Sequence, residues 1–192
     1  METKEQIRKH LLSLRSEIPP HICESSAKEV LHILKTHPKI TEHGYLYAYY
    51  PHGKELSLLP FLEWALNAEK RVALPKTDNN TMDFYEITDL SQVTTGAFGV
   101  QEPVNTRKVA WEEAVCLIPG VGFTTDGKRI GHGKAFYDRY LTEHPRLCKI
   151  GICHEIQLLS ELPTDPTDIP MEYLVTPKRR IQCHAPKERS LL

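Results

Sequence analysis

The sequence predicts an α/β fold in three layers, with a mostly parallel central sheet covered on both faces. Stretches with helical spacing alternate with stretches that read as strands, which is typical of parallel sheets joined by helical crossovers. The nearly continuous apolar run "AVCLIPGVGF" over 114–123 predicts a strand buried on both faces. With 192 residues the chain can bury one sizeable core, so we expect one domain over residues 1–192.

The N-terminal third predicts helices first and a strand afterwards. Amphipathic spacing indicates helices at 3–17 and about 22–36, which are separated by two prolines and closed by Pro38. The aromatic segment "YLYAYY" at 45–50 predicts a strand. A third helix is expected over 56–70, with Ser57 as the candidate N-cap.

The remaining elements follow the same alternation. Apolar residues bounded by turn formers predict short strands, and the segment after a glycine-rich loop predicts a helix. We expect strands at 71–76, 82–87, 149–153 and 172–176, a helix at about 134–144, a helical turn near 155–161, and a loose tail over the last dozen residues, "IQCHAPKERSLL".

Charge and cysteine content exclude several classes of protein. The 24 basic and 25 acidic residues nearly cancel, so no general attraction to nucleic acid or to an anionic membrane is expected. No run of about 18 apolar residues is present, and the N-terminus is charged. The five cysteines are odd in number and form no C-x-x-C pair, which argues against a disulfide framework or a zinc ribbon. We therefore expect a cytoplasmic protein.

The segment "GHGKAFYDRYL" at 131–141 carries the strongest chemical signal. It joins a strand and turn to a helix, an arrangement that presents backbone N–H groups to a phosphate. It lacks the Walker A pattern, and Phe136 stands where a dinucleotide fingerprint has glycine or alanine. Lys134 lies where a helix begins, a position that disfavours a cation unless an anion is nearby. Asp138 follows it, and a carboxylate near phosphates indicates magnesium. The alternative interpretation is a flexible turn.

The first predicted helix carries a second cluster of cations. Lys4, Arg8 and Arg15 lie immediately beside the apolar stripe that begins with Ile7 and Leu11. These side chains either snorkel on a surface helix or contact phosphates at the edge of a cleft.

The segment "LIPGVGFTTDGKRIGHGKAFYDRYL" at 117–141 resembles the signature of the 5-formyltetrahydrofolate cyclo-ligases, also called 5,10-methenyltetrahydrofolate synthetases. In that family an apolar strand ending in P-G-x-x-F precedes a G-x-G-K/G-G-Y-Y-D segment. Other pieces fall in the family order, so the resemblance covers about residues 4–176. These pieces are "KEQIR", "YAYYPHGKEL", "ALPK", "GVQEP" and "TDPTDIPMEYLVT".

The resemblance implies an ATP- and magnesium-dependent ring closure of 5-formyltetrahydrofolate to 5,10-methenyltetrahydrofolate, with release of ADP and phosphate. The formyl oxygen would be phosphorylated first, giving an imino-phosphate that N10 attacks. The implied fold is similar to the sugar-isomerase-like architecture (NagB, RpiA and CoA transferase). The implied partner is the folate alone, possibly polyglutamylated, and the implied assembly is a monomer or weak homodimer.

The resemblance also implies roles for individual residues. Lys134 and Arg8 would be catalytic, and Asp138 and Asp168 would hold magnesium. The folate would contact Arg8, Tyr50, Glu55 and Lys134. The nucleotide would contact Lys4, Arg8, Arg129, Ile130, Gly131, His132, Gly133, Lys134, Ala135, Phe136 and Tyr137.

The chain departs from the family pattern at Ala135 and Phe136, where the family usually has glycine and tyrosine. A non-catalytic folate- or nucleotide-binding module of the same fold therefore stays open as an alternative. An RNA-binding protein that uses the basic patch "PKRR" at 177–180 and the cationic N-terminal helix is a weaker alternative, because the net charge is near neutral. A sugar-phosphate isomerase is weaker still, because fold does not determine chemistry.

Overall fold

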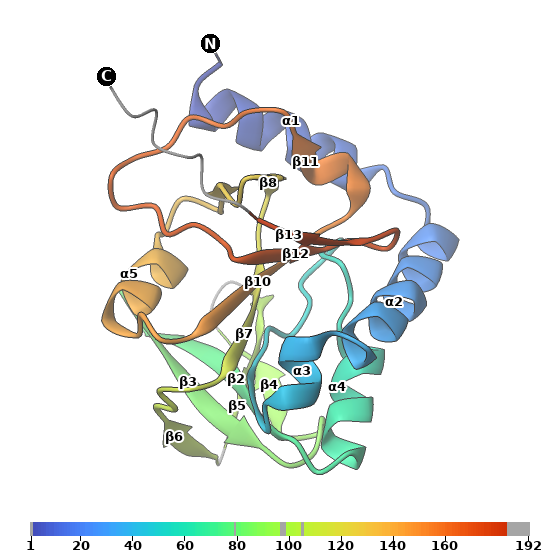
Figure 1. Ribbon diagram of the computed structural model, residues 1–192, viewed down its shortest axis with the longest axis vertical. Coiled ribbons are helices and arrows are strands. Elements are labelled where there is room, and N and C mark those ends of the chain that lie inside the picture. The colour runs from blue at the N-terminus through green and yellow to red at the C-terminus, as the bar shows by residue number, and fades with distance from the viewer. Residues whose placement is uncertain (1, 79, 97–98, 105, 184–192) are drawn as a thin grey trace.

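The computed structural model describes residues 2–78, 80–96, 99–104 and 106–183 (Figure 1). In this part of the chain the largest sheet has eight strands, in the order β13-β12-β10-β7-β1-β2-β3-β6. Pairing is parallel from β12 to β2 and antiparallel at both edges, which confirms the predicted mostly parallel sheet. The strands are β1 (Tyr45–Tyr47), β2 (Arg71–Asp78), β3 (Thr81–Ile87), β6 (Arg107–Val109), β7 (Val115–Pro119), β10 (Cys148–Ile152), β12 (Tyr173–Val175) and β13 (Arg180–Gln182).

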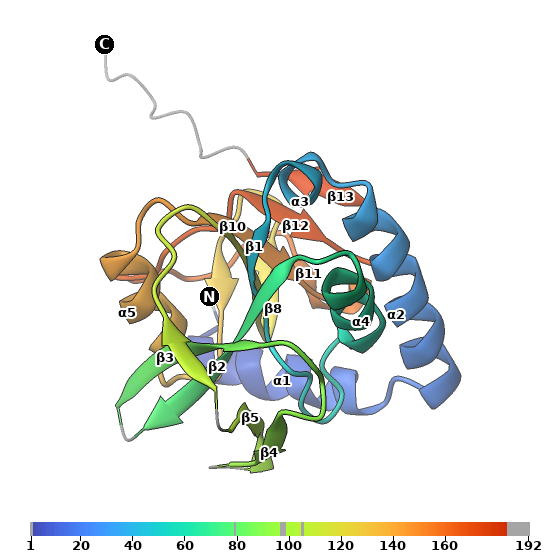
Figure 2. The ribbon, with the colours of Figure 1, turned by 90° about the horizontal axis from the view of Figure 1, so that it is seen from below.

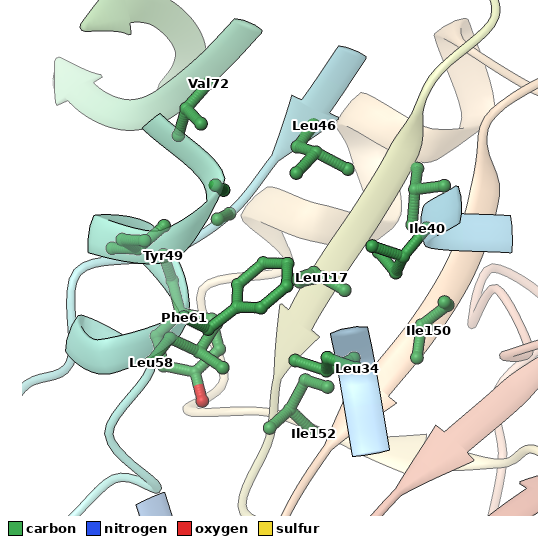
Figure 3. Packing of buried hydrophobic residues seen from close by; sticks show 14 of the residues in the cluster. Leu34, Ile40, Leu46, Tyr49, Leu58, Phe61, Val72, Leu117, Ile150 and Ile152 are labelled. Atoms are coloured by element: carbon green, nitrogen blue, oxygen red, sulfur yellow. The ribbon is translucent and has the colours of Figure 1, made fainter. Parts of the chain in front are cut away.

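Helices cover both faces of this sheet, and the side chains of successive residues in a strand pack alternately into the two resulting cores. On β7, Leu117 packs on one face, whereas its neighbours Cys116 and Ile118 pack on the other, because side chains alternate along a strand. Figure 3 shows Leu117 beside Leu34 and Phe61, which come from helices on the first face. The first face carries α2 (Pro20–Lys35), α3 (Pro38–Glu42) and α4 (Leu59–Asn67), and the second carries α5 (Phe136–Glu143), as Figure 2 shows.

Helix α1 (Lys4–Ser16) packs on a third, smaller core. Its N-cap is Thr3, whose side chain accepts a hydrogen bond from the Gln6 N–H. The Gln6 side chain in turn accepts one from the Thr3 N–H. Ile7 and Leu11, one turn apart, are its buried apolar residues and pack with Val121. Beneath it lie β8 (Gly122–Thr124), β9 (Arg129–Ile130), β11 (Leu158–Leu159) and the short helix η2 (Glu155–Gln157).

The strand order reverses at β1. The chain runs from β1 to β2 on one side of β1, and later returns to β7 on the other side. In open α/β sheets, ligands bind in the crevice outside the carboxyl ends of strands at such a reversal. The residues that follow β1 and β7 are therefore placed where a binding site is expected.

Several elements differ from those predicted. The apolar run 114–123 is two strands, β7 and β8, in different sheets, because the chain turns at Gly120 and the Val121 N–H bonds to Ile130. Helix α4 begins at Leu59 with Leu58, not Ser57, as its N-cap. Helix α3, strand β6 and the hairpin of β4 (Val93–Thr95) and β5 (Gln101–Pro103) were not predicted.

The predicted loose tail begins inside a strand, because Ile181 and Gln182 belong to β13 and pair with β12. The Cys183 N–H continues this contact by donating to the Glu172 carbonyl. The rest of the predicted tail, 184–192, lies outside the described residues. Among the residues that are described, no helix has the length and apolar character needed to cross a membrane.

Candidate active site

A pocket of about 580 Å³ lies at the carboxyl ends of β1, β2 and β7. Four parts of the chain that are far apart in sequence meet in its lining: the first helix, the segment after β1, the glycine loop and the segment before β12. All the residues predicted for the site line this pocket, namely Lys4, Arg8, Tyr50, Glu55, Arg129, Ile130, Gly131, His132, Gly133, Lys134, Ala135, Phe136, Tyr137, Asp138 and Asp168. The structure thus brings the predicted site together, while the role of each residue stays a prediction.

The glycine loop is shaped by two residues with left-handed backbone. Gly133 has φ 94°, and Ala135, which caps α5, has φ 52°. The left-handed conformation suits glycine but is strained for alanine. Arg8 fastens the loop to α1, because its Nε donates to the Gly131 carbonyl at 2.8 Å. Lys134 lines the pocket from the middle of this loop.

Arg129 is buried behind the loop, and its guanidinium is engaged by protein groups. Its Nη2 donates to Asp138 Oδ2 at 2.9 Å, and its Nη1 lies 3.4 Å from the Pro119 carbonyl. The guanidinium also lies 5.6 Å from the centre of the Tyr137 ring, whose burial raises the pKa of its hydroxyl well above the usual value. These contacts brace the start of α5 against the end of β7. Ile130 packs its side chain in the core beneath α1.

Lys4 joins the first helix to the segment before β12. Its Nζ lies 2.6 Å from Asp165 Oδ2 and 2.5 Å from Asp168 Oδ2. Burial lowers the pKa of the Lys4 ammonium, but the hydrogen bonds to these two carboxylates outweigh that effect and leave the pKa raised. Lys4 is therefore charged at neutral pH, and its ammonium is bound by two carboxylates of the segment before β12.

Glu55 follows β1 and presents its carboxylate to the pocket. Oε2 accepts a hydrogen bond from the His52 N–H at 3.0 Å, and Oε1 lies 3.5 Å from His132 Nε2 of the glycine loop. Tyr50 lines the same wall, and Tyr49 beside it donates its hydroxyl to the Leu56 carbonyl at 2.6 Å. The segment after β1 thus offers a hydrogen-bond acceptor next to aromatic rings, the combination that a flat, N–H-bearing ring requires.

The carboxylates near the loop suit a magnesium ion that is bound jointly by protein and phosphate oxygens. They suit an ion held by protein side chains alone less well. No group of three metal-binding side chains occurs among the described residues. Magnesium, however, usually takes only one or two carboxylates and completes its shell with phosphate oxygens and water. Asp168 suits this role, because its hydrogen bonds from Lys4 and from the Asp165 N–H both fall on Oδ2. Both carboxylate oxygens of Asp138 already accept a hydrogen bond, one from Arg129 and one from the Ile169 N–H.

Ten residues of the lining were not singled out from the sequence, and Asp165, Tyr49 and Glu102 are three of them. Asp165 lies in an exposed proline-rich stretch, where a turn former is the ordinary reading. Tyr49 is one of three aromatic residues in "YAYY", and spacing alone does not say which faces a ligand. Glu102 belongs to the segment "GVQEP", which was quoted for the family resemblance without a role, and only the packing of β5 against β2 brings it to the pocket.

The model of the 5-formyltetrahydrofolate cyclo-ligase family matches residues 1–177. A 5-formyltetrahydrofolate cyclo-ligase of Mycolicibacterium smegmatis is 30% identical over 93% of this chain and 96% of its own. A probable 5-formyltetrahydrofolate cyclo-ligase of Schizosaccharomyces pombe is 29% identical over 93% of this chain and 97% of its own.

Solved structures agree with these relatives. The 5,10-methenyltetrahydrofolate synthetase of Aquifex aeolicus superposes with a TM-score of 0.84 at 31% identity, over 98% of this chain and 96% of its own. The corresponding protein of Mycoplasma pneumoniae has a TM-score of 0.74 over 92% of this chain and 99% of its own, and at 22% identity it supports the fold alone. The expected similarity to sugar isomerases stays a prediction.

Proposed function

Because the chain belongs to the 5-formyltetrahydrofolate cyclo-ligase family and is an enzyme of that family, we propose that it closes 5-formyltetrahydrofolate to 5,10-methenyltetrahydrofolate with ATP and magnesium. The observation that carries this proposal is the meeting, in one pocket, of a cationic glycine loop and a carboxylate set beside aromatic rings. The loop suits a triphosphate, and the carboxylate suits the folate ring.

The proposed reaction has two steps. N10 is a weak nucleophile and the formyl oxygen is a poor leaving group, so the oxygen must first be activated. The formyl oxygen forms a bond to the γ-phosphorus of ATP while the bond to ADP breaks. N10 then forms the new bond to the formyl carbon and gives up its proton, and phosphate leaves with the former formyl oxygen.

Phosphoryl transfer needs chiefly positioning and neutralisation of charge, which the loop side of the pocket can supply. Lys4 and Arg8 would hold the phosphates from α1, and the backbone of the loop would cradle them. Lys134 would stabilise the charge that develops on the transferred group. Arg8 would align the loop with the folate, and its hydrogen bond to the Gly131 carbonyl supports this role.

The segment after β1 would hold the folate. Glu55 would accept hydrogen bonds from ring N–H groups, and Tyr50 would pack against the ring. Because His132 of the loop lies against Glu55, the folate and the phosphates would meet at this contact.

Magnesium, when bound, would neutralise the charge of the triphosphate. Asp168 would be its first carboxylate ligand and Asp138 the second. Binding at Asp138 would require that Arg129 share or release an oxygen.

The first test is the near-ultraviolet absorbance of the methenyl product when the protein meets 5-formyltetrahydrofolate at neutral pH, with and without magnesium and ATP. An absorbance that increases only when magnesium and ATP are both present supports the proposal. If absorbance does not grow while folate and nucleotide both bind, the chain is a binding module. Ala135 makes that second outcome worth testing, because it holds a strained left-handed conformation where the resemblance indicates glycine.

A further inference from the structure

Glu102 lies in the wall of the pocket, on the short strand β5. Its Oε1 accepts two hydrogen bonds from Thr77 at the end of β2, one from the backbone N–H at 3.0 Å and one from Oγ1 at 2.8 Å. The residue is only 5% exposed, yet it is part of the pocket lining. The fold therefore places a carboxylate in the wall of the site, on a strand to which the proposed function gives no role.

The charge of Glu102 has no opposite charge beside it among the described residues. The other carboxylates of the lining each face a cationic or protonatable group: Glu55 faces His132, Asp138 faces Arg129, and Asp165 and Asp168 face Lys4. A buried carboxylate is costly unless it is paired or hydrogen-bonded. Two hydrogen bonds on one oxygen leave acceptor capacity on this carboxylate, which can take about four.

The surroundings of Glu102 select the kind of group that it can bind. Pro75, Met82 and Val100 line the pocket with it and give this wall an apolar surface. A negative charge in such a wall repels a triphosphate and attracts N–H donors of a flat ring. Glycine at position 96 is part of the arrangement, because a methyl group there would overlap the Glu102 carboxylate.

We propose that Glu102 is a folate-binding residue of the pocket, whose carboxylate accepts a hydrogen bond from an N–H group of the reduced pterin ring. This inference rests on the proposed function. The reduced pterin carries several N–H donors, whereas adenine carries only its exocyclic amine, so a pocket with carboxylates at both Glu55 and Glu102 suits the folate. Glu102 thus contributes to the choice of folate over other ring substrates.

The test compares Glu102→Gln with Glu86→Gln. The first variant keeps an oxygen for Thr77 but replaces the second oxygen with a donor, which opposes a ring N–H. The second makes the same change at a carboxylate held by Arg71 and Arg107, outside the pocket lining. Calorimetry would give the dissociation constants of 5-formyltetrahydrofolate, of p-aminobenzoylglutamate, which lacks the ring, and of magnesium-ADP.

We expect Glu102→Gln to weaken folate binding at least tenfold and to leave ADP and p-aminobenzoylglutamate within twofold of the unaltered protein. Glu86→Gln should change none of the three. Unchanged folate binding in Glu102→Gln overturns the inference, and so does a parallel loss of all three ligands. Failure of the unaltered protein to bind folate at all would instead overturn the proposed function.

A purely structural role of Glu102 predicts a different pattern. In that case Thr77→Val, which removes one hydrogen bond to Glu102 but keeps the carboxylate, would weaken folate binding as much as Glu102→Gln. Should Glu102→Gln fail to fold, Glu102→Asp replaces it, because it keeps the charge but withdraws it by one methylene. A tenfold loss of folate affinity with normal ADP binding in that variant supports the inference, and normal folate affinity overturns it.

Discussion

Ala135 holds a backbone conformation that its side chain disfavours. Its φ of 52° lies in the left-handed region, at the residue that caps α5. The strain costs an L-residue about 1–2 kcal/mol, and the sequence resemblance indicates that relatives usually carry glycine here. The loop has therefore kept its path without the residue that fits it best.

Replacing Ala135 by glycine should stabilise the protein. Relief of strain outweighs the extra freedom of glycine in the unfolded chain, so we expect Ala135→Gly to raise the free energy of unfolding by about 0.5 kcal/mol. Urea unfolding measures the change. Ala68→Gly is the matched control, because Ala68 has an ordinary φ of −87° and should lose about 0.5 kcal/mol. A loss of stability in both variants would mean that Ala135 is not strained.

Lys134 should matter for turnover more than for binding. A cation that acts on charge developing in phosphoryl transfer contributes mainly in the transition state, so Lys134→Ala should lower kcat by about 100- to 1000-fold. The Kd of the folate should change much less. Lys178→Ala, which removes an exposed lysine outside the pocket lining, should leave kcat unchanged. Turnover that survived in Lys134→Ala would remove the catalytic role assigned to the loop.

The sequence could predict functional residues that lie close together along the chain. It could not predict which residues from distant parts of the chain contact one another. Lys134 was recognisable because glycines and a helix start surround it within a few residues. The partners of Lys4 could not be foreseen, because Asp165 and Asp168 reach it only through the packing of α1 over β8, β9 and β11. The same is true of Glu102, whose approach to the pocket depends on the packing of β5 against β2.

At the scale of elements, side chains of α1 join this helix to the rest of the site. The helix belongs to no sheet, and three of its cations each contact a different segment of the chain. Lys4 reaches Asp165 and Asp168, Arg8 reaches the Gly131 carbonyl, and Arg15 lies 3.4 Å from the Gly120 carbonyl. These are the cations that the sequence placed beside the apolar stripe.

Loss of the Lys4 contact should loosen the first turn of α1. Lys4→Met leaves Asp165 and Asp168 without their cation, and we expect a loss of about 1 kcal/mol, faster hydrogen exchange over residues 4–8, and about tenfold weaker nucleotide binding. Lys9→Met alters an exposed lysine of the same helix and should do none of these. If the backbone amides of residues 4–8 exchanged hydrogen at equal rates in the two variants, the Lys4 contact would not stabilise the first turn of α1.

Most helices and the central strands could be predicted because their apolar spacing is long and regular. Residues 4–16 and 20–35 are helical nearly as expected. The short edge strands carry no such signal: β13 is three residues long and contains no residue that is fully buried. The break between β7 and β8 was also hidden, because both strands are apolar. Glycine stands at the break, where a Cβ would lie 2.5 Å from the Phe123 ring.

At the scale of the whole molecule, two buried histidines make stability depend on pH. Burial lowers the pKa of His37 and of His154 to about 4, with nearby cations adding to the effect. Among the described residues, neither Nε2 has a hydrogen-bond partner. From pH 6.5 down to about 4 the unfolded chain binds protons that the native protein does not, so stability falls as the pH falls.

We expect each histidine to lower the free energy of unfolding by about 2 kcal/mol when the pH falls from 7.5 to 5. Urea unfolding at both pH values measures this loss. His154→Gln cannot take up the proton, so its loss over this range should be smaller by about 2 kcal/mol. His21→Gln, at an exposed position, should behave like the unaltered protein. Equal losses in all three proteins would show that folding does not lower the pKa of His154.

The contact between Lys4 and Asp168 joins residues that are 164 positions apart. Closing so long a loop is costly in entropy, and contacts of this kind form late on a folding pathway. The central strands can pair while the first helix and the segment before β12 are still apart, so secondary structure would return during refolding before the ability to bind nucleotide. A chain cut anywhere between these residues would have to bring the pieces back together before it could recover the pocket.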